Sequence, residues 1–275
     1  MNEVWQALAR EAGFSAEHLA IGVTALGKAN YAQQAYYGQA FFALTIGLER
    51  AAKLALVVDH SIEHNGVFPS YQMIRGYSHN LKELLGKADE IAERRGLSAR
   101  VDRLPRTSIH AGIVEVLSDF ASNVTRYYNL DLITGDPRAT KHVDPVRAWY
   151  KQVIIPVLAA HYHQNKKERH QSNARLIAQM LGSDAKILYH AETGDPIDSV
   201  YEASMQTAIT DFAKPYVRMY VMQIARFFSS LFSELGNAAH RCQLEAIPEL
   251  SEFFAIFNNS DEYFRQRKSW SIYQP

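Results

Sequence analysis

The sequence predicts an all-α protein. Apolar residues recur at spacings of three and four over most of the chain, and no segment shows the convincing alternation of a half-buried strand. Hydrophobic residues make up 47% of the 275 residues, which is enough for a sizeable core without disulfides or structural metal. This length fits one large helical domain or two smaller ones.

The first part of the chain predicts two short helical segments and one long helix. Residues 3–12 form an amphipathic segment, and Ser15 caps a second segment in which Gly22 lowers the helix propensity. A long helix follows over residues 29–64, with small and apolar side chains along one face, and Gly66 ends it. Because this face is rich in alanine, we expect neighbouring helices to approach it closely.

The next part predicts two helices separated by a polar connector. A short turn or helix at residues 69–75 precedes Ser78, which we expect to be the N-cap of a helix over residues 79–95. Thr107, or the serine that follows it, caps the next helix, over residues 108–128.

The second half predicts two long helices and an aromatic-rich end. Asp144 followed by a proline is a typical helix start, so we expect a helix over residues 144–181 that bends near Pro156. A short segment at residues 185–190 comes next, and a second long helix covers residues 198–240.

A loop near residue 135 divides the chain in this scheme. We expect residues 1–135 to form a compact helical bundle and residues 136–275 to form a helical extension packed against it. No glycine- or serine-rich linker separates the two parts, so a flexible tether between them is not predicted.

The composition argues against several classes of function. Lys plus Arg and Asp plus Glu each number 29, so the total charge provides no broad attraction for nucleic acid, although a local basic patch stays open. Cys242 is the only cysteine, which fits a reducing compartment. The first residues do not resemble a signal peptide, and the longest nearly uncharged apolar stretch, residues 35–48, is too short to span a bilayer. We therefore expect a cytoplasmic protein with no membrane partner.

Arg75 and His79 are the most informative pair for chemistry. An arginine holds a phosphate by a forked contact, and a histidine moves protons near neutral pH. Both stand where a new helix is predicted to begin, next to Asn80, which could orient a phosphate. The alternative is that His79 and Asn80 only satisfy the backbone donors of a helix start.

Four segments of the first half form a recognisable pattern: residues 37–42 leading into residues 48–56, the Tyr-Ser-His-Asn-Leu start at residues 77–81, residues 117–120, and the Thr-Arg-Tyr-Tyr at residues 125–128. Together they resemble the HEPN superfamily of helical bundles. The resemblance implies a bundle that often dimerises. Active members cleave RNA without a metal ion. Others are inactive modules that bind nucleotides or proteins, frequently in toxin–antitoxin or phage-defence systems.

The active members' motif is an arginine, four to six further residues and then a histidine, and this chain departs from it. Arg75 and His79 have only three residues between them, and so do Arg106 and His110. Arg103 and His110 have six, but the proline between them breaks the helix that the motif needs. We interpret this last spacing as a chance match.

The resemblance and the residues together suggest a candidate site. The catalytic candidates are His79, Arg75 and Asn80, with no metal ion and no cofactor. The candidates for binding nucleic acid or a nucleotide are Arg126, Tyr127, Lys53 and Glu49. Glu49 and Lys53 are equally suited to a salt bridge along one helix, and Arg126 and Tyr127 to an ion pair and a core ring.

The residues His60, Glu63 and His64 spell the H-x-x-E-H pattern of inverted zinc metallopeptidases. They lie at the end of the predicted long helix, where histidines are favourable without any metal. Three hypotheses thus stay open: a metal-independent endoribonuclease acting as a homodimer, a non-catalytic module that binds a nucleotide, RNA or a protein partner such as an antitoxin or defence component, and a zinc hydrolase. Whether the protein is an enzyme is not decided by its sequence.

Overall fold

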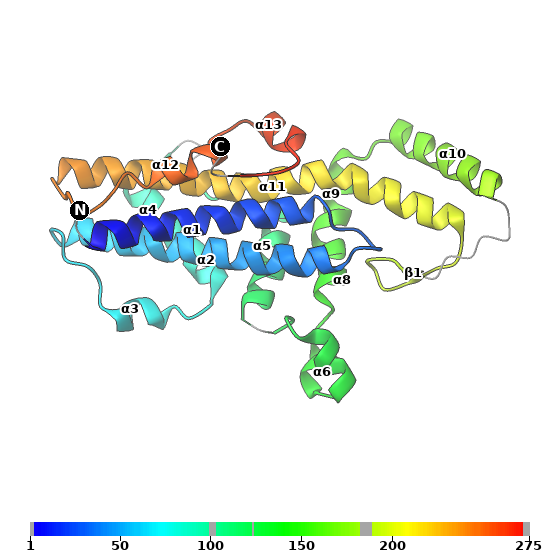
Figure 1. Ribbon diagram of the computed structural model, residues 1–275, viewed down its shortest axis with the longest axis horizontal. Helices are drawn as coiled ribbons and strands as arrows, with labels where there is room; N and C mark the ends of the chain where they lie inside the picture. The colour runs from blue at the N-terminus through cyan, green and yellow to red at the C-terminus, as the bar shows by residue number, and fades with distance from the viewer. Residues whose placement is uncertain (1–2, 99–102, 123, 182–188, 272–275) are drawn as a thin grey trace.

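The computed structural model describes residues 3–98, 103–122, 124–181 and 189–271 (Figure 1). Helices make up 73% of the chain, and the described residues include one two-stranded sheet, so the predicted all-α fold is confirmed. In chain order the elements are α1 (Glu3–Leu26), α2 (Ala35–Glu63), α3 (Tyr71–Gly76), α4 (Leu81–Arg94), α5 (Ser108–Ala121), α6 (Tyr128–Thr134), α7 (Pro137–Lys141), α8 (Pro145–Trp149), the π-helix η2 (Tyr150–Ile154), α9 (Ile155–His161), α10 (Gln164–Leu181), β1 (Tyr189–His190), β2 (Pro196–Ile197), α11 (Val200–Arg241), α12 (Ser251–Phe254), the 3₁₀-helix η3 (Ala255–Phe257) and α13 (Asp261–Gln266).

The centre of the fold is the antiparallel pair α1 and α2 (Figure 1). The prediction of two short segments before α2 is wrong, because α1 is one continuous helix. Two glycines face the contact: a Cβ on Gly22 would lie 2.6 Å from Cγ of Leu44, and one on Gly47 would lie 2.9 Å from the backbone nitrogen of Leu19. Their low helix propensity is offset by the close packing that they allow.

The start of α2 also differs from the prediction. The helix begins at Ala35 rather than near residue 29, because the side-chain oxygen of Asn30 accepts hydrogen bonds from the backbone nitrogens of Ala32 and Gln33, each at 2.9 Å. This side chain holds a turn before the helix. The end is close to the prediction, since α2 stops at Glu63 and the chain turns at Gly66 with φ of +90°.

The long helix α11 joins the second half of the chain to the first. It packs against α1, α2 and α5, while α12 and α13 cover another side of it (Figure 1). The hydrophobic core is therefore continuous and includes residues from before and after residue 135. The boundary between residues 1–135 and 136–275 stays a prediction.

The prediction of one continuous helix over residues 144–181 is wrong. Asp144 caps α8 as expected, but the chain then passes through the π-helix η2 before α9. The backbone nitrogen of Ile155 bonds to the carbonyl of Tyr150, five residues back, immediately before Pro156. A proline cannot donate the next bond and its ring crowds the preceding turn, which explains the irregular winding. The chain turns again after His161, and α10 follows as a separate helix.

The segment predicted at residues 185–190 lies largely outside the described residues. Its last two residues form β1, which pairs antiparallel with β2 in a short hairpin that the sequence did not predict. This hairpin, α10 and the first part of α11 extend beyond the end of α1 and α2, and α6 projects from another side (Figure 1). The candidate site residues lie on the main bundle and near α6.

Candidate functional site

Three of the predicted site residues meet on one face of α2. Nδ1 of His79 lies 3.1 Å from both carboxylate oxygens of Glu49. The ammonium of Lys53 donates to Oε1 of Glu49 at 2.7 Å and to the carbonyl oxygen of Ser78 at 2.7 Å. We call this group the Glu49–His79 pair, with Lys53 beside it. It brings together a carboxylate and an ammonium group from α2 and an imidazole from the turn before α4.

The turn between α3 and α4 places His79 over α2. Ser78 adopts a φ of +47°, in the left-handed region, so the chain reverses direction just before His79. The N-cap of α4 is Asn80 and not Ser78 as predicted: its side-chain oxygen accepts from the backbone nitrogen of Glu83 at 3.2 Å. Asn80 also donates to the carboxylate of Glu83 at 3.0 Å, so its amide serves the helix start.

Exposure leaves one side of the His79 ring available. The side chain of His79 is 61% exposed, whereas that of Glu49 is only 17% exposed. A carboxylate beside Nδ1 favours the tautomer with its proton on that nitrogen. In the described part of the chain no group bonds to Nε2, so this nitrogen is free to accept a proton from a bound molecule.

Arg75 does not join this group. Its guanidinium lies 5.8 Å from the centre of the Tyr71 ring, on α3, and no hydrogen bond or ion pair links it to His79 among the described residues. The cation that contacts the pair is instead Lys53, whose ammonium group bonds to Glu49. The arrangement therefore differs from the arginine-and-histidine pairing that the sequence suggested.

Arg126 and Tyr127 occupy a different place. The guanidinium of Arg126 lies 5.2 Å from the ring of Phe42 and 5.4 Å from the ring of Phe120, and both predicted residues line a cavity of about 330 Å³ near Pro145. Arg126 is therefore held mainly by aromatic rings. Tyr127 is 55% exposed rather than a core ring.

A second polar cluster, which the sequence analysis did not identify as a site, surrounds His110. His110 is 2% exposed and lies between the hydroxyl of Thr107, at 2.6 Å from Nδ1, and Oε1 of Gln223, at 2.8 Å from Nε2. Gln223 donates its amide to Asp261 at 2.9 Å, which makes its oxygen the acceptor from Nε2–H of His110. Both ring nitrogens are thus engaged, and burial lowers the pKa of His110 to about 4.

Asp89, near His110, binds the connector that precedes α5. Its carboxylate is 1% exposed and accepts from Arg103 at 2.7 and 3.0 Å, from Arg106 at 2.6 Å and from the backbone nitrogen of Leu104 at 3.2 Å. Burial by itself raises the pKa of Asp89, but the hydrogen bonds from these donors outweigh it, so its pKa lies below the ordinary value. Arg103 and His110, whose spacing we interpreted as a chance match, line one cavity without touching each other.

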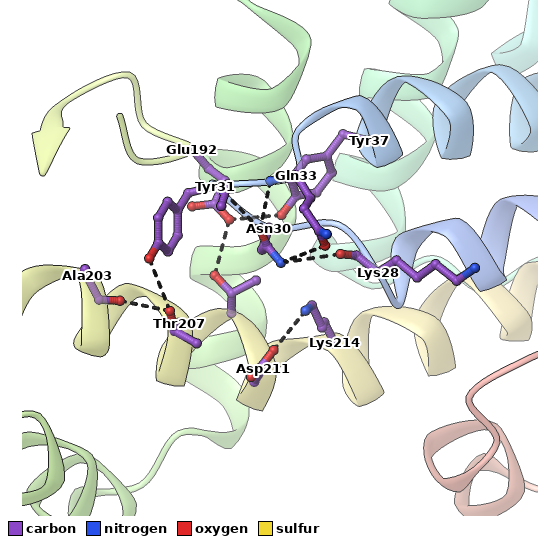
Figure 2. A network of polar contacts seen from close by, with 12 residues as sticks. Lys28, Asn30, Tyr31, Gln33, Tyr37, Glu192, Ala203, Thr207, Asp211 and Lys214 are labelled. Atoms are coloured by element: carbon purple, nitrogen blue, oxygen red, sulfur yellow. Dashed lines mark hydrogen bonds and ion pairs between the residues drawn. The ribbon is translucent and has the colours of Figure 1, made fainter. Parts of the chain in front are cut away.

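A third cluster holds the hairpin to the bundle. Glu192 is 2% exposed and accepts from Gln206 at 2.7 Å and from the hydroxyls of Tyr37 and Thr210 at 3.3 Å each. Figure 2 shows its carboxylate facing Tyr37, beside the contact of Thr207 with Tyr31. Burial and the charge of Glu192 raise the pKa of Tyr37 well above its usual value. The cluster fastens β1–β2 to α2 and α11, and no sequence motif marked it.

The H-x-x-E-H residues are not arranged as a metal site. The rings of His60 and His64 stack with centres 3.9 Å apart, Nδ1 of His64 lies 2.8 Å from the carbonyl oxygen of His60, and Glu63 pairs with Arg94 at 2.8 Å. No group of three or more metal-ligating side chains is assembled within the residues that the structure describes.

Comparisons with protein-family models, curated proteins and solved structures gave no match to this chain. Among the described helices, none has both the length and the apolar character needed to cross a membrane.

Proposed function

We propose that the chain is a HEPN-like endoribonuclease that works without a metal ion, with His79 as its general base. One observation carries this proposal: Nδ1 of His79 faces both oxygens of Glu49 at 3.1 Å while 61% of the side chain stays exposed. A histidine oriented by a carboxylate, with its other nitrogen turned to solvent, is suited to remove a proton from a hydroxyl group.

In the proposed reaction, Nε2 of His79 takes the proton of a ribose 2′-hydroxyl, and the 2′-oxygen bonds to the adjacent phosphorus. The bond from phosphorus to the 5′-oxygen breaks, and that oxygen receives a proton from a general acid. Lys53 adds positive charge beside the reacting group, and Arg75 binds the RNA backbone from α3. The products are a 2′,3′-cyclic phosphate and a 5′-hydroxyl.

A homodimer is part of this proposal. One histidine does not readily act as base and acid in the same step, whereas a second copy of the chain supplies a second His79. A cytoplasmic setting, in a toxin–antitoxin or phage-defence system, is also proposed, and the exposed, unpaired Cys242 fits a reducing compartment.

The test is incubation of the purified protein with total RNA in EDTA, followed by detection of 2′,3′-cyclic phosphate ends. We expect cleavage that falls at least about 100-fold in His79→Ala, since a general base contributes about that much. Glu49→Gln should lower it less, because the ring remains but loses its orienting charge. His64→Ala is the matched control, because His64 is also exposed and lies outside the proposed site. Cleavage that survives in His79→Ala, or no cleavage at all, contradicts the proposal.

A second candidate function is binding of RNA or a protein partner without cleavage. The observation that favours it is the position of Arg75, whose guanidinium lies over Tyr71 instead of beside His79. In this case the same RNA should stay intact yet shift in a native gel. Arg75→Gln would weaken that shift while His79→Ala would not.

A further inference from the structure

A cavity with several charged lining residues lies away from the Glu49–His79 pair. It has a volume of about 640 Å³ and lies between the middle of α4, the connector before α5, the first turn of α5, one face of α11 and the start of α13. Its size is that of a pocket for a small molecule of nucleotide dimensions. No part of the proposed endoribonuclease site lines it.

Positive charge prevails in this cavity. Its lining includes the arginines Arg103, Arg106 and Arg226 and the aspartates Asp89 and Asp261. Glu93, which accepts from Arg103 at 3.2 Å, has a side chain that is 72% exposed and lies outside the lining. The neutral His110 adds no charge near neutral pH. The lining thus has one more cation than anions.

Two of the three arginines keep donors for a ligand. The Arg106 side chain is 76% exposed. Its Nη2 donates to Asp89 at 2.6 Å, and its other nitrogens make no hydrogen bond with the described residues. Arg226 bonds through Nη1 to Asp261 and to the carbonyl of Asn259, both at 3.0 Å, and its Nη2 makes no hydrogen bond with the described residues. Thr107, the N-cap of α5, lines the same space, so the positive end of that helix also faces it.

The other wall of the cavity is apolar and aromatic. Leu104 and Pro105 contribute to it from the connector before α5, and Met219 and Tyr220 contribute to it from α11. The Tyr220 hydroxyl is engaged by Nε2 of His161 at 2.9 Å, which holds the ring in place. A fixed aromatic ring with a methionine and a proline near it suits a flat ring system.

We propose that this cavity binds a phosphate monoester attached to a flat ring, with the phosphate at Arg106 and Arg226 and the ring against Tyr220. A guanidinium with free donors binds phosphate by forked, charge-assisted hydrogen bonds. The size of the cavity restricts the ligand to about one mononucleotide. The site is independent of RNA cleavage at His79.

Isothermal titration calorimetry with three probes tests the inference. Adenosine 5′-monophosphate contains both the ring and the phosphate, adenosine only the ring, and inorganic phosphate only the anion. We expect the monophosphate to bind more tightly than either fragment. Arg106→Gln should weaken binding of the monophosphate about tenfold or more, because one charge-assisted contact is lost. The Arg106 side chain is exposed, so we expect this variant to fold. Arg241→Gln, an exposed arginine paired with Glu234, is the matched control and should bind normally.

Two results would overturn this assignment: no measurable binding of the monophosphate, or equal affinity in the wild type and Arg106→Gln. The proposed endoribonuclease is tested separately. His79→Ala should retain full binding of the monophosphate, and Arg106→Gln should retain cleavage of RNA, so the failure of one proposal leaves the other intact.

Discussion

His79 and His110 have the same local setting in sequence and opposite settings in the fold. Each follows an arginine with three residues between them, and each lies close to the start of a helix. His79 is exposed, pairs with a carboxylate and keeps Nε2 free, whereas His110 is buried with both nitrogens bonded. In neither case does the preceding arginine contact the histidine: Arg75 lies over Tyr71, and Arg106 bonds to Asp89.

The difference shows that burial, and not spacing, decides what a histidine can do. A buried imidazole that satisfies two partners stabilises the fold and is kept neutral. An exposed imidazole contributes little to stability but remains available to a substrate. Changes around His110 should therefore alter stability strongly, and changes around His79 should leave stability nearly unchanged and affect only the proposed RNA cleavage.

The largest effect is expected from Asp89→Asn, on the His110 side. The substitution removes the charge that faces Arg103 and Arg106 in a buried place, so the free energy of unfolding should fall by about 3 kcal/mol. Urea denaturation at pH 7 measures it. Glu115→Gln is the control, because it removes an acid from an exposed ion pair, Lys82 with Glu115 between α4 and α5, and should cost about 0.5 kcal/mol or less. Equal losses in the two variants would contradict the buried role of Asp89.

The pH dependence of Asp89 has a defined sign. Its pKa in the folded protein lies below the ordinary value of 3.8, so the stabilisation is present above about that pH and is lost as the pH falls towards the folded pKa. Asp89→Asn should therefore flatten the stability profile only in that acidic range. A flattening near neutral pH would point to another group.

The next effect is a pH-dependent loss caused by His110. Its pKa is about 4 in the folded protein and 6.5 in the unfolded chain, so between these values the unfolded state binds more protons and stability falls as the pH is lowered. Between pH 7.5 and 5.0 the wild type should lose about 2 kcal/mol more than His110→Gln does. Urea midpoints at the two pH values provide the comparison.

His79→Gln is the control for that experiment, because it replaces an exposed histidine in the same way and keeps His110, so the loss caused by His110 should persist in it. If His110→Gln instead lost as much stability as the wild type on acidification, another histidine with a lowered pKa, such as the partly buried His161, would be responsible. Burial also lowers the pKa of His161.

The smallest stability effect is expected on the other side of the comparison. His79→Ala should change the free energy of unfolding at pH 7 by less than about 0.5 kcal/mol, because the ring is exposed and its pairing with Glu49 is solvent-screened. The same urea assay tests it. A loss above about 1.5 kcal/mol would mean that His79 holds α4 to α2 and is a structural residue.

Local chemistry predicted much of the fold correctly. The long helices α2 and α11 follow from apolar spacing, and Thr107 and Asp144 cap helices as their side chains suggest. Errors occurred where contacts from distant residues outweighed local preference. Ser15 was expected to cap a new helix, but within α1 its hydroxyl bonds to the carbonyl of Glu11, because packing on α2 keeps the helix continuous.

The candidate site was predictable only in part. Glu49 and Lys53 lie one turn apart on one helix, so their contact follows from helical geometry. The cap of α4 was placed two residues too early, at Ser78 instead of Asn80. The approach of His79 to Glu49 spans thirty positions and depends on the left-handed turn at Ser78. The clusters around His110 and Glu192 join residues more than a hundred positions apart, so no local spacing could indicate them.

The amino-acid sequence alone determined the helical class, the long helices α2 and α11 and the caps at Thr107 and Asp144, since these depend on interactions within a few residues. Only the tertiary structure decided which histidine is exposed, which acids are buried and which arginines face a cavity. The physical reason is that burial depends on how distant helices pack, and burial sets the charge state and the availability of each side chain.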